Sequence, residues 1–168
     1  MRTYYNRIAG QSLERLAALS NGIFAVAMTL LVLDLRVPVS TISQRIINEQ
    51  DLWNALVNLR PNLLPYLMSF LTLGIFWVGQ QTQINYFKQS NRHLTWIHLV
   101  FLLAVTLMPF STGLLAAYIT FRVALVVYWL NVVLLGVMLF ISWRYARHAQ
   151  LLKDEVTEEI LRQINAAS

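Results

Sequence analysis

The stretch RLAALSNGIFAVAMTLLVLDL, residues 15–35, decides the fold class of this chain. From Leu19 to Leu35 its only charged residue is Asp34, close to the end. A helix needs roughly 20 mostly apolar residues to cross the hydrocarbon core of a bilayer, and somewhat fewer when its flanks reach the interface. The preceding polar residues are too many for the n-region of a signal peptide, and no small-residue cleavage site closes the run. The stretch is therefore predicted to be a retained membrane span.

The composition of the whole chain also indicates a lipid environment. Apolar residue types make up 57% of the residues and charged ones only 12%, far from the balance of a soluble domain. No Asp or Glu occurs between Asp51 and Asp154. The net charge of +5 comes from Lys and Arg in short clusters between apolar runs, so nucleic acid is not an expected partner. The chain has no cysteine, which excludes disulfides and thiolate metal sites.

Three more apolar stretches are long enough to cross a membrane. Together with the first they predict an all-α, polytopic transmembrane helix bundle in which residues 1–168 form a single domain. The predicted spans are residues 19–35, 63–79, 94–110 and 123–143. Pro109 is expected to end or kink the third helix, because proline lacks a backbone N–H and its ring clashes with the preceding turn. Residues 111–122 are then either an interfacial turn or the start of a long fourth helix.

The distribution of Lys and Arg predicts the orientation of these spans, because short cytoplasmic loops carry an excess of both. One side of a four-span bundle receives Arg2, Arg7, Arg15, Lys88, Arg92, Arg144, Arg147, Lys153 and Arg162. The other side receives only Arg36, Arg45, Arg60 and Arg122. Both termini are therefore predicted to be cytoplasmic. Residues 38–60 have apolar side chains at roughly helical spacing and are expected along the outer interface, and residues 151–164 are expected to form an amphipathic cytoplasmic helix.

The first span has two distinct sides. One is a stripe of small residues that permits close helix packing, formed by Ala18, Gly22, Ala25 and Thr29. The other is an apolar seam at steps of three and four residues, formed by Ile23, Val26, Leu30 and Leu33. In a symmetric assembly this seam would close a hydrophobic constriction. The residues alone favour the simpler interpretation that the seam packs against neighbouring helices or lipid.

Polar residues near membrane depth are costly and normally face partners or a water path. Such residues here are Arg15, Ser20 and Asn21, and their candidate partners in other spans are Trp77, His98 and Asn131. A purely structural hydrogen-bond network and direct binding of an ion or solute both remain open, with the network slightly favoured. A proton relay through His98 is disfavoured because the second to fourth spans contain no carboxylate.

Signatures of enzymes are absent: no phosphate-binding glycine loop, no HExxH and no GxSxG occurs, and neither catalysis nor a cofactor is expected. The TVGYG filter of ordinary potassium channels is missing too. Asp34, beside Arg36, would either attract cations to a pore mouth or form an interfacial ion pair.

Three segments resemble the transmembrane protein 175 family of endolysosomal potassium channels and their prokaryotic relatives. Residues 15–21, followed by GIFAVAMTLLVLDL, resemble its R-x-x-x-F-S-D signature and first helix. YLMSFLTLGIFW, residues 66–77, resembles the second helix, and LTWIHLVFLLAVTLMPFSTGLL, residues 94–115, the third. The chain departs from the pattern at Leu19, where the family has Phe, and at Asn21, where it has Asp. The usual pattern also has six spans, two more than are found here.

The resemblance implies a homotetrameric channel for potassium ions in a prokaryotic plasma membrane, without a TVGYG filter. The first helix of each copy would line the pore, with the constriction at Ile23, Val26, Thr29 and Leu30, and with Leu33 continuing the seam. Arg15, Ser20, Asn21, Trp77 and His98 would form a hydrogen-bonded support behind it. Two alternatives remain. One is a secondary transporter of a small solute or protons that uses Asn21 and His98, and the other is a scaffold subunit without transport.

Overall fold

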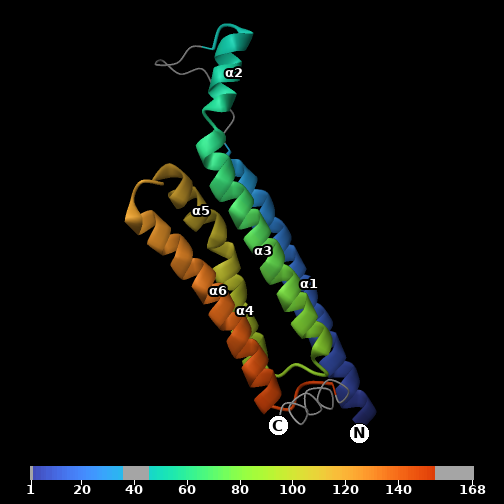
Figure 1. Cartoon of the computed structure of the whole chain (residues 1–168). Helices are drawn as coiled ribbons and strands as arrows, with labels where there is room; N and C mark the ends of the chain where they lie inside the picture. The colour runs from blue at the N-terminus through green and yellow to red at the C-terminus, as the bar shows by residue number, and fades with distance from the viewer. Residues whose placement is uncertain (1, 36–45, 154–168) are drawn as a thin grey trace, which may run out of the picture.

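The computed structural model describes residues 2–35 and 46–153, and within them every side chain except those of residues 2–12 and Asp34. Six α-helices and one short 3-10 turn lie within these ranges. The elements are α1 (Arg2–Leu31), η1 (Val32–Asp34), α2 (Glu49–Val57), α3 (Arg60–Tyr86), α4 (Arg92–Thr106), α5 (Met108–Ala117) and α6 (Arg122–His148). In Figure 1, α1 and α3 run side by side, and α6 runs beside α4 and α5.

Within residues 2–35 and 46–153, four helical stretches are long and apolar enough to cross a membrane. They are Leu13–Leu31, Arg60–Tyr86, Arg92–Ala117 and Arg122–His148. In the described ranges the only extended pairing is an isolated bridge between Phe87 and Leu152. The predicted all-α membrane bundle is therefore confirmed. Backbone hydrogen bonds within helices explain this outcome, since a helix satisfies every backbone polar group that lipid cannot.

The third span is longer than predicted, and it is broken. Helix α4 ends at Thr106, Leu107 adopts a turn, and α5 continues from Met108 to Ala117. The break coincides with Pro109, which can donate no backbone hydrogen bond. Residues 111–117 are thus neither an interfacial turn nor part of the fourth helix, because the fourth helix begins at Arg122. The two predicted alternatives for this segment were both wrong.

The first span also differs in its limits. Helix α1 begins at Arg2 and ends at Leu31, where the 3-10 turn Val32–Asp34 follows. At the same end of the bundle, α2 extends away from the other helices beyond α3 (Figure 1). A capping box, in which Asn48 and Asp51 exchange side-chain to backbone hydrogen bonds, starts this helix. Residues 38–45 of the expected interfacial segment and residues 154–164 of the expected cytoplasmic helix lie outside the described residues.

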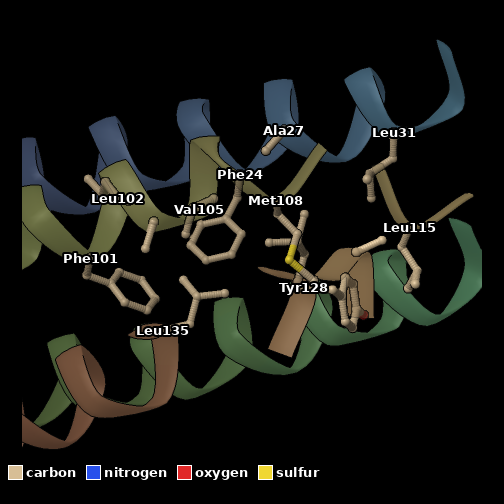
Figure 2. Packing of buried hydrophobic residues seen from close by; sticks show 13 residues of the cluster. Phe24, Ala27, Leu31, Phe101, Leu102, Val105, Met108, Leu115, Tyr128 and Leu135 are labelled. Atoms are coloured by element: carbon tan, nitrogen blue, oxygen red, sulfur yellow. The ribbon is translucent and has the colours of Figure 1, made fainter. Parts of the chain in front are cut away.

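The apolar core is formed by α1, α3, α4, α5 and α6. From α1 come Phe24, Ala27 and Leu31, which are at most 2% exposed and recur on one face of the helix. Figure 2 shows them against Phe101, Leu102, Val105, Met108, Leu115, Tyr128 and Leu135. The Phe24 and Phe101 rings are tilted, with centroids 6.0 Å apart. This packing fixes which face of α1 points inward, and so which face points away from the subunit.

Candidate functional site

The face of α1 opposite the core is uncovered within one subunit. Its members lie roughly 120–180° around the helix axis from the buried Phe24. They include Val26, 57% exposed, and Leu30, 42% exposed, and Leu33 of η1, 66% exposed, continues the same side. Thr29 is exposed too, whereas Ile23 is half-buried against the core. The predicted seam therefore lies mostly on the surface of the subunit, with Ile23 at its edge.

The small-residue stripe lies on the same uncovered face. Ala18, Gly22, Ala25 and Thr29 are all exposed. A Cβ atom added at Gly22 would meet no atom within 4 Å, so no helix of the same subunit uses this glycine for close approach. Beside the stripe, a hollow of about 440 Å³ is lined by α1 and by Thr106 of α4. The stripe is not used for packing inside the described part of the subunit.

Behind this face, four buried polar side chains join four helices, and we call them the inner cluster. They are Ser20 of α1, Gln80 of α3, His98 of α4 and Ser142 of α6, none more than 1% exposed. Gln80 Nε2 donates to Ser20 Oγ over 2.8 Å and lies 3.4 Å from His98 Nδ1. His98 Nε2 lies 3.1 Å from Ser142 Oγ. Because an amide nitrogen only donates, His98 Nδ1 accepts from Gln80, and the proton lies on His98 Nε2, which donates to Ser142 Oγ.

Asn21 makes a separate pair of contacts on the neighbouring flank of α1. Its Oδ1 accepts hydrogen bonds from Trp77 Nε1 at 2.9 Å and from Gln81 Nε2 at 2.6 Å. Both donors belong to α3, so this residue ties α1 to α3. A carboxylate oxygen would accept both bonds equally well. Asparagine therefore preserves the geometry of this contact, although it removes a negative charge.

Arg15 does not join either group in this structure. Its side chain is exposed, and no hydrogen bond or ion pair connects it to the described residues. It lies more than one turn before Ser20, on the uncovered side of α1. The expected support is thus divided: Ser20 lies with His98, Asn21 lies with Trp77, and Arg15 stands apart from both.

Asn131 belongs to a second buried group further along the bundle, which we call the outer cluster. Its members are Ser69 of α3, Ser111 and Thr112 of α5, and Tyr128 and Asn131 of α6. Thr112 Oγ1 donates to Ser69 Oγ over 2.7 Å, and Ser69 Oγ donates to Tyr128 Oη over 3.4 Å. None of these groups contacts Ser20 or Asn21, so Asn131 is not the partner that the sequence suggested for them.

The side chain of Asn131 fills the break between α4 and α5. In the amide orientation that satisfies both ends, Nδ2 donates to the Ala104 carbonyl over 3.0 Å, and Oδ1 accepts from Met108 N–H over 3.2 Å. A continuous helix would join these two backbone groups directly, since they are four residues apart. The carboxamide thus replaces the hydrogen bond that the break interrupts.

Sequence reasoning missed Gln80, Gln81 and Ser142 of the support and most of the outer cluster. The signal was present, because an uncharged polar residue inside an apolar span needs a buried partner as much as a histidine does. Uncharged polar residues also occur at exposed helix positions, however, where they do not indicate a buried partner. Among the described residues, no group of three or more His, Cys, Asp or Glu side chains could hold a metal ion.

Comparisons with known proteins give a consistent result. The family model of the endosomal/lysosomal potassium channel TMEM175 matches residues 15–109, more than half of the chain. A potassium channel of Streptomyces collinus is 36% identical over 105 residues, which are 62% of this chain and 48% of that protein. A potassium channel of Chamaesiphon minutus is 31% identical over 141 residues, which are 82% of this chain and 68% of that protein.

A solved structure agrees with these relatives. The crystal structure of a lysosomal potassium-selective channel TMEM175 homolog from Chamaesiphon minutus superposes with a TM-score of 0.73 at 28% identity. The superposition covers 89% of this chain and 79% of that one. The match to the family model, residues 15–109, includes the signature helix and the two spans that contribute Trp77 and His98. The chain is an integral membrane protein that belongs to the TMEM175 family.

Proposed function

We propose that four copies of this chain form a potassium-permeable channel whose pore is lined by α1. The observation that carries the proposal is the uncovered face of α1, where an apolar seam lies beside a stripe of small residues. Two relatives named as potassium channels support it. We further propose that the assembly lies in a prokaryotic plasma membrane with both termini cytoplasmic, as the Lys and Arg distribution suggests.

The uncovered faces of α1 and α6 differ in a way that favours α1 as the pore helix. The exposed side of α6 consists largely of big apolar residues such as Val123, Leu130 and Phe140, as expected for a surface in contact with lipid. The exposed side of α1 instead includes Gly22, Ala25 and other small residues. Small residues let helices approach closely in a membrane. Four copies of α1 can thus surround a narrow path.

The proposed mechanism is hydrophobic gating. Rings of Val26 and Leu30 would exclude water when the path is narrow and pass a partly hydrated cation when the helices move apart. Leu33 extends this seam, and Ile23 borders it. Thr29 Oγ1 donates to the Val26 carbonyl over 2.8 Å, which leaves the oxygen lone pairs free to replace part of an ion's hydration shell. Such a filter should select potassium over sodium less strictly than a ring of carbonyls.

The test is planar-bilayer recording of the purified protein in opposed potassium and sodium gradients. Val26→Ser and Leu30→Ser should each raise the single-channel conductance, because a hydroxyl makes the constriction easier to wet. Val133→Ser is the matched control: Val133 is 52% exposed, against 57% for Val26, but it lies on α6. Equal conductance in the wild type and in Val26→Ser and Leu30→Ser would overturn the assignment of the pore face.

The rival function, a secondary transporter, gains no support from the geometry. Asn21 and His98 belong to separate groups, and His98 is 1% exposed with both ring nitrogens in contact with polar neighbours. They do not line a shared substrate site in this conformation. Saturable, coupled uptake without single-channel steps would favour the transporter, and no flux at all would favour a scaffold subunit.

A further inference from the structure

The C-terminal end of α6 lies at the same end of the bundle as the start of α1 (Figure 1). This end of α6 carries an aromatic and basic cleft. The cleft has a volume of about 340 Å³ and is lined by Phe140, Trp143, Arg144, Arg147 and His148. At 100° per residue, these side chains all lie on one face of the helix. The face extends about 10 Å along the axis from Phe140 to Arg147. It therefore reaches from the expected headgroup layer into the hydrocarbon.

Trp143, the aromatic wall of the cleft, is held in place by the rest of the bundle. Trp143 packs against an apolar cluster that includes Phe87, Leu94 and Ala146. Its ring also meets the edge of Tyr86, with centroids 6.0 Å apart. Phe140, by contrast, is 62% exposed. The cleft thus has a fixed aromatic wall and an exposed apolar side chain on the membrane side, the arrangement of an interfacial aromatic belt.

The positive charges of the cleft are not neutralised within the described part of the chain. Arg144 and Arg147 are exposed, and they form no ion pair there. The described carboxylate at this end of the bundle is Glu14 of α1, which does not pair with them. The dipole of α6 accounts for cations in its last turn. It does not account for Arg144, which lies one turn earlier and beside Trp143.

We propose that this cleft binds the phosphate headgroup of an anionic phospholipid. Arg144 and Arg147, one turn apart, would hold the phosphate oxygens through their planar guanidinium groups. His148 borders the same site, and Phe140 contacts the start of an acyl chain. Basic side chains next to a membrane span are a recognised means of attracting anionic headgroups. Lipid is favoured over a free anion because the aromatic wall offers an apolar contact that inorganic phosphate cannot use.

Native mass spectrometry of the purified protein tests this site without relying on conduction. The probes are phosphatidylglycerol and phosphatidylcholine, each added to the delipidated protein. The wild type should retain phosphatidylglycerol preferentially, and Arg144→Gln and Arg147→Gln should each weaken that retention about fivefold. Arg122→Gln is the matched control, because Arg122 is an exposed arginine at the opposite end of the same helix, and it should change retention less than twofold.

Further arms separate the alternatives. Replacement of both Arg144 and Arg147 by lysine keeps the charge but removes the guanidinium groups, so retention of phosphatidylglycerol should still fall. Full retention would overturn specific binding of the phosphate by arginine and would show that positive charge is sufficient. Displacement of the lipid by millimolar inorganic phosphate would overturn the lipid as occupant. Equal retention of both lipids by the wild type, or equal losses in Arg122→Gln and Arg147→Gln, would overturn the cleft itself.

Discussion

The inner and outer clusters hold the bundle in different ways. The inner cluster includes a side chain of α1, Ser20, and the adjacent Asn21 is bonded to α3. The outer cluster joins α3, α5 and α6 but contains no residue of α1. Within residues 13–33, all hydrogen bonds from α1 side chains to other helices are made at Ser20 and Asn21. One half of α1 is thus fixed by directional bonds and the other half is not.

The other half of α1 is held by apolar packing. Ala27 and Leu31 belong to the buried apolar core with Met108 and Leu115 of α5, as Figure 2 shows. Apolar contacts are not directional, so they tolerate a small rotation or shift better than hydrogen bonds do. The proposed constriction residues lie in this half. We therefore expect gating movements of α1 to pivot about Ser20 and Asn21.

The largest expected effect is that of His98→Leu. This change leaves Ser142 Oγ without its partner and removes one of the two contacts of Gln80 Nε2. The other end of the same amide, Gln80 Oε1, is already buried without a partner among the described residues. Each unpaired buried group costs about 1–3 kcal/mol, so the free energy of unfolding should fall by about 2–4 kcal/mol. Denaturant unfolding in detergent measures it.

His93→Leu is the control for this change, because His93 lies on the same helix but is exposed. It should alter the free energy of unfolding by less than about 1 kcal/mol. The His98 variant should also change open probability in the folded fraction, since α1 loses part of its anchor. If His98→Leu lowered the free energy of unfolding no more than His93→Leu does, the inner cluster would not stabilise the fold.

The next largest effect is expected for Asn131→Leu in the outer cluster. The Ala104 carbonyl and the Met108 N–H would both lose their partner, at about 1–3 kcal/mol each. Because Asn131 is 7% exposed, against 1% for His98, the total cost should lie near the lower bound, at about 2–3 kcal/mol. Asn131→Asp should cost a similar amount, because a carboxylate cannot donate to the Ala104 carbonyl. Folded channels should nevertheless conduct as the wild type does, since this cluster does not bond to α1. A conductance change as large as that of His98→Leu would contradict the division between the two clusters.

A smaller effect is expected at Asn21, where the chain departs from the family signature. Asn21→Asp keeps an acceptor for Trp77 and Gln81 and makes both bonds charge-assisted, so thermal unfolding in detergent should rise or stay the same. Asn21→Leu removes the acceptor and should cost about 1–2 kcal/mol, because these groups are only partly buried. Because the chain has five tryptophans, fluorescence of a variant that keeps Trp77 as its only tryptophan would report whether the α1 to α3 contact persists. Destabilisation by Asn21→Asp would mean that the local geometry requires a neutral side chain at position 21.

The sequence predicted the fold class, and it grouped residues of α1 that the structure leaves uncovered, because both depend on local patterns. Apolar run length indicates a membrane span without knowledge of its neighbours. The helical period also placed Val26, Leu30 and Leu33 on one side of α1, and the structure shows that side uncovered. The pore-lining role of these residues stays a prediction.

What the sequence missed depends on tertiary contacts. The pairing of Gln80 with His98, and the separation of Asn131 from Asn21, follow from how four helices cross. The continuation of the third span past Pro109 depends on Asn131, which is supplied by another helix and offsets the interrupted hydrogen bond. No local pattern near residue 109 reports that partner. Arg15 is a different case: its charge suggested a place in the support, but its position on α1 points it away from Ser20.

The smallest effect on stability, and the sharpest test of the uncovered half of α1, is expected for Thr29→Val. The two side chains are close in size, and the Thr29 hydroxyl bonds only to the Val26 carbonyl of its own helix. The free energy of unfolding should change by less than about 0.5 kcal/mol, as for other surface positions. The permeability ratio of potassium to sodium, measured from reversal potentials, should nevertheless change if the hydroxyl faces the ion. Thr82→Val is the matched control, because Thr82 is also exposed and bonds to the Val78 carbonyl of its own helix, α3. An unchanged permeability ratio for Thr29→Val, or equal changes of the ratio in both variants, would show that the Thr29 hydroxyl does not contribute to ion selection although this face is exposed.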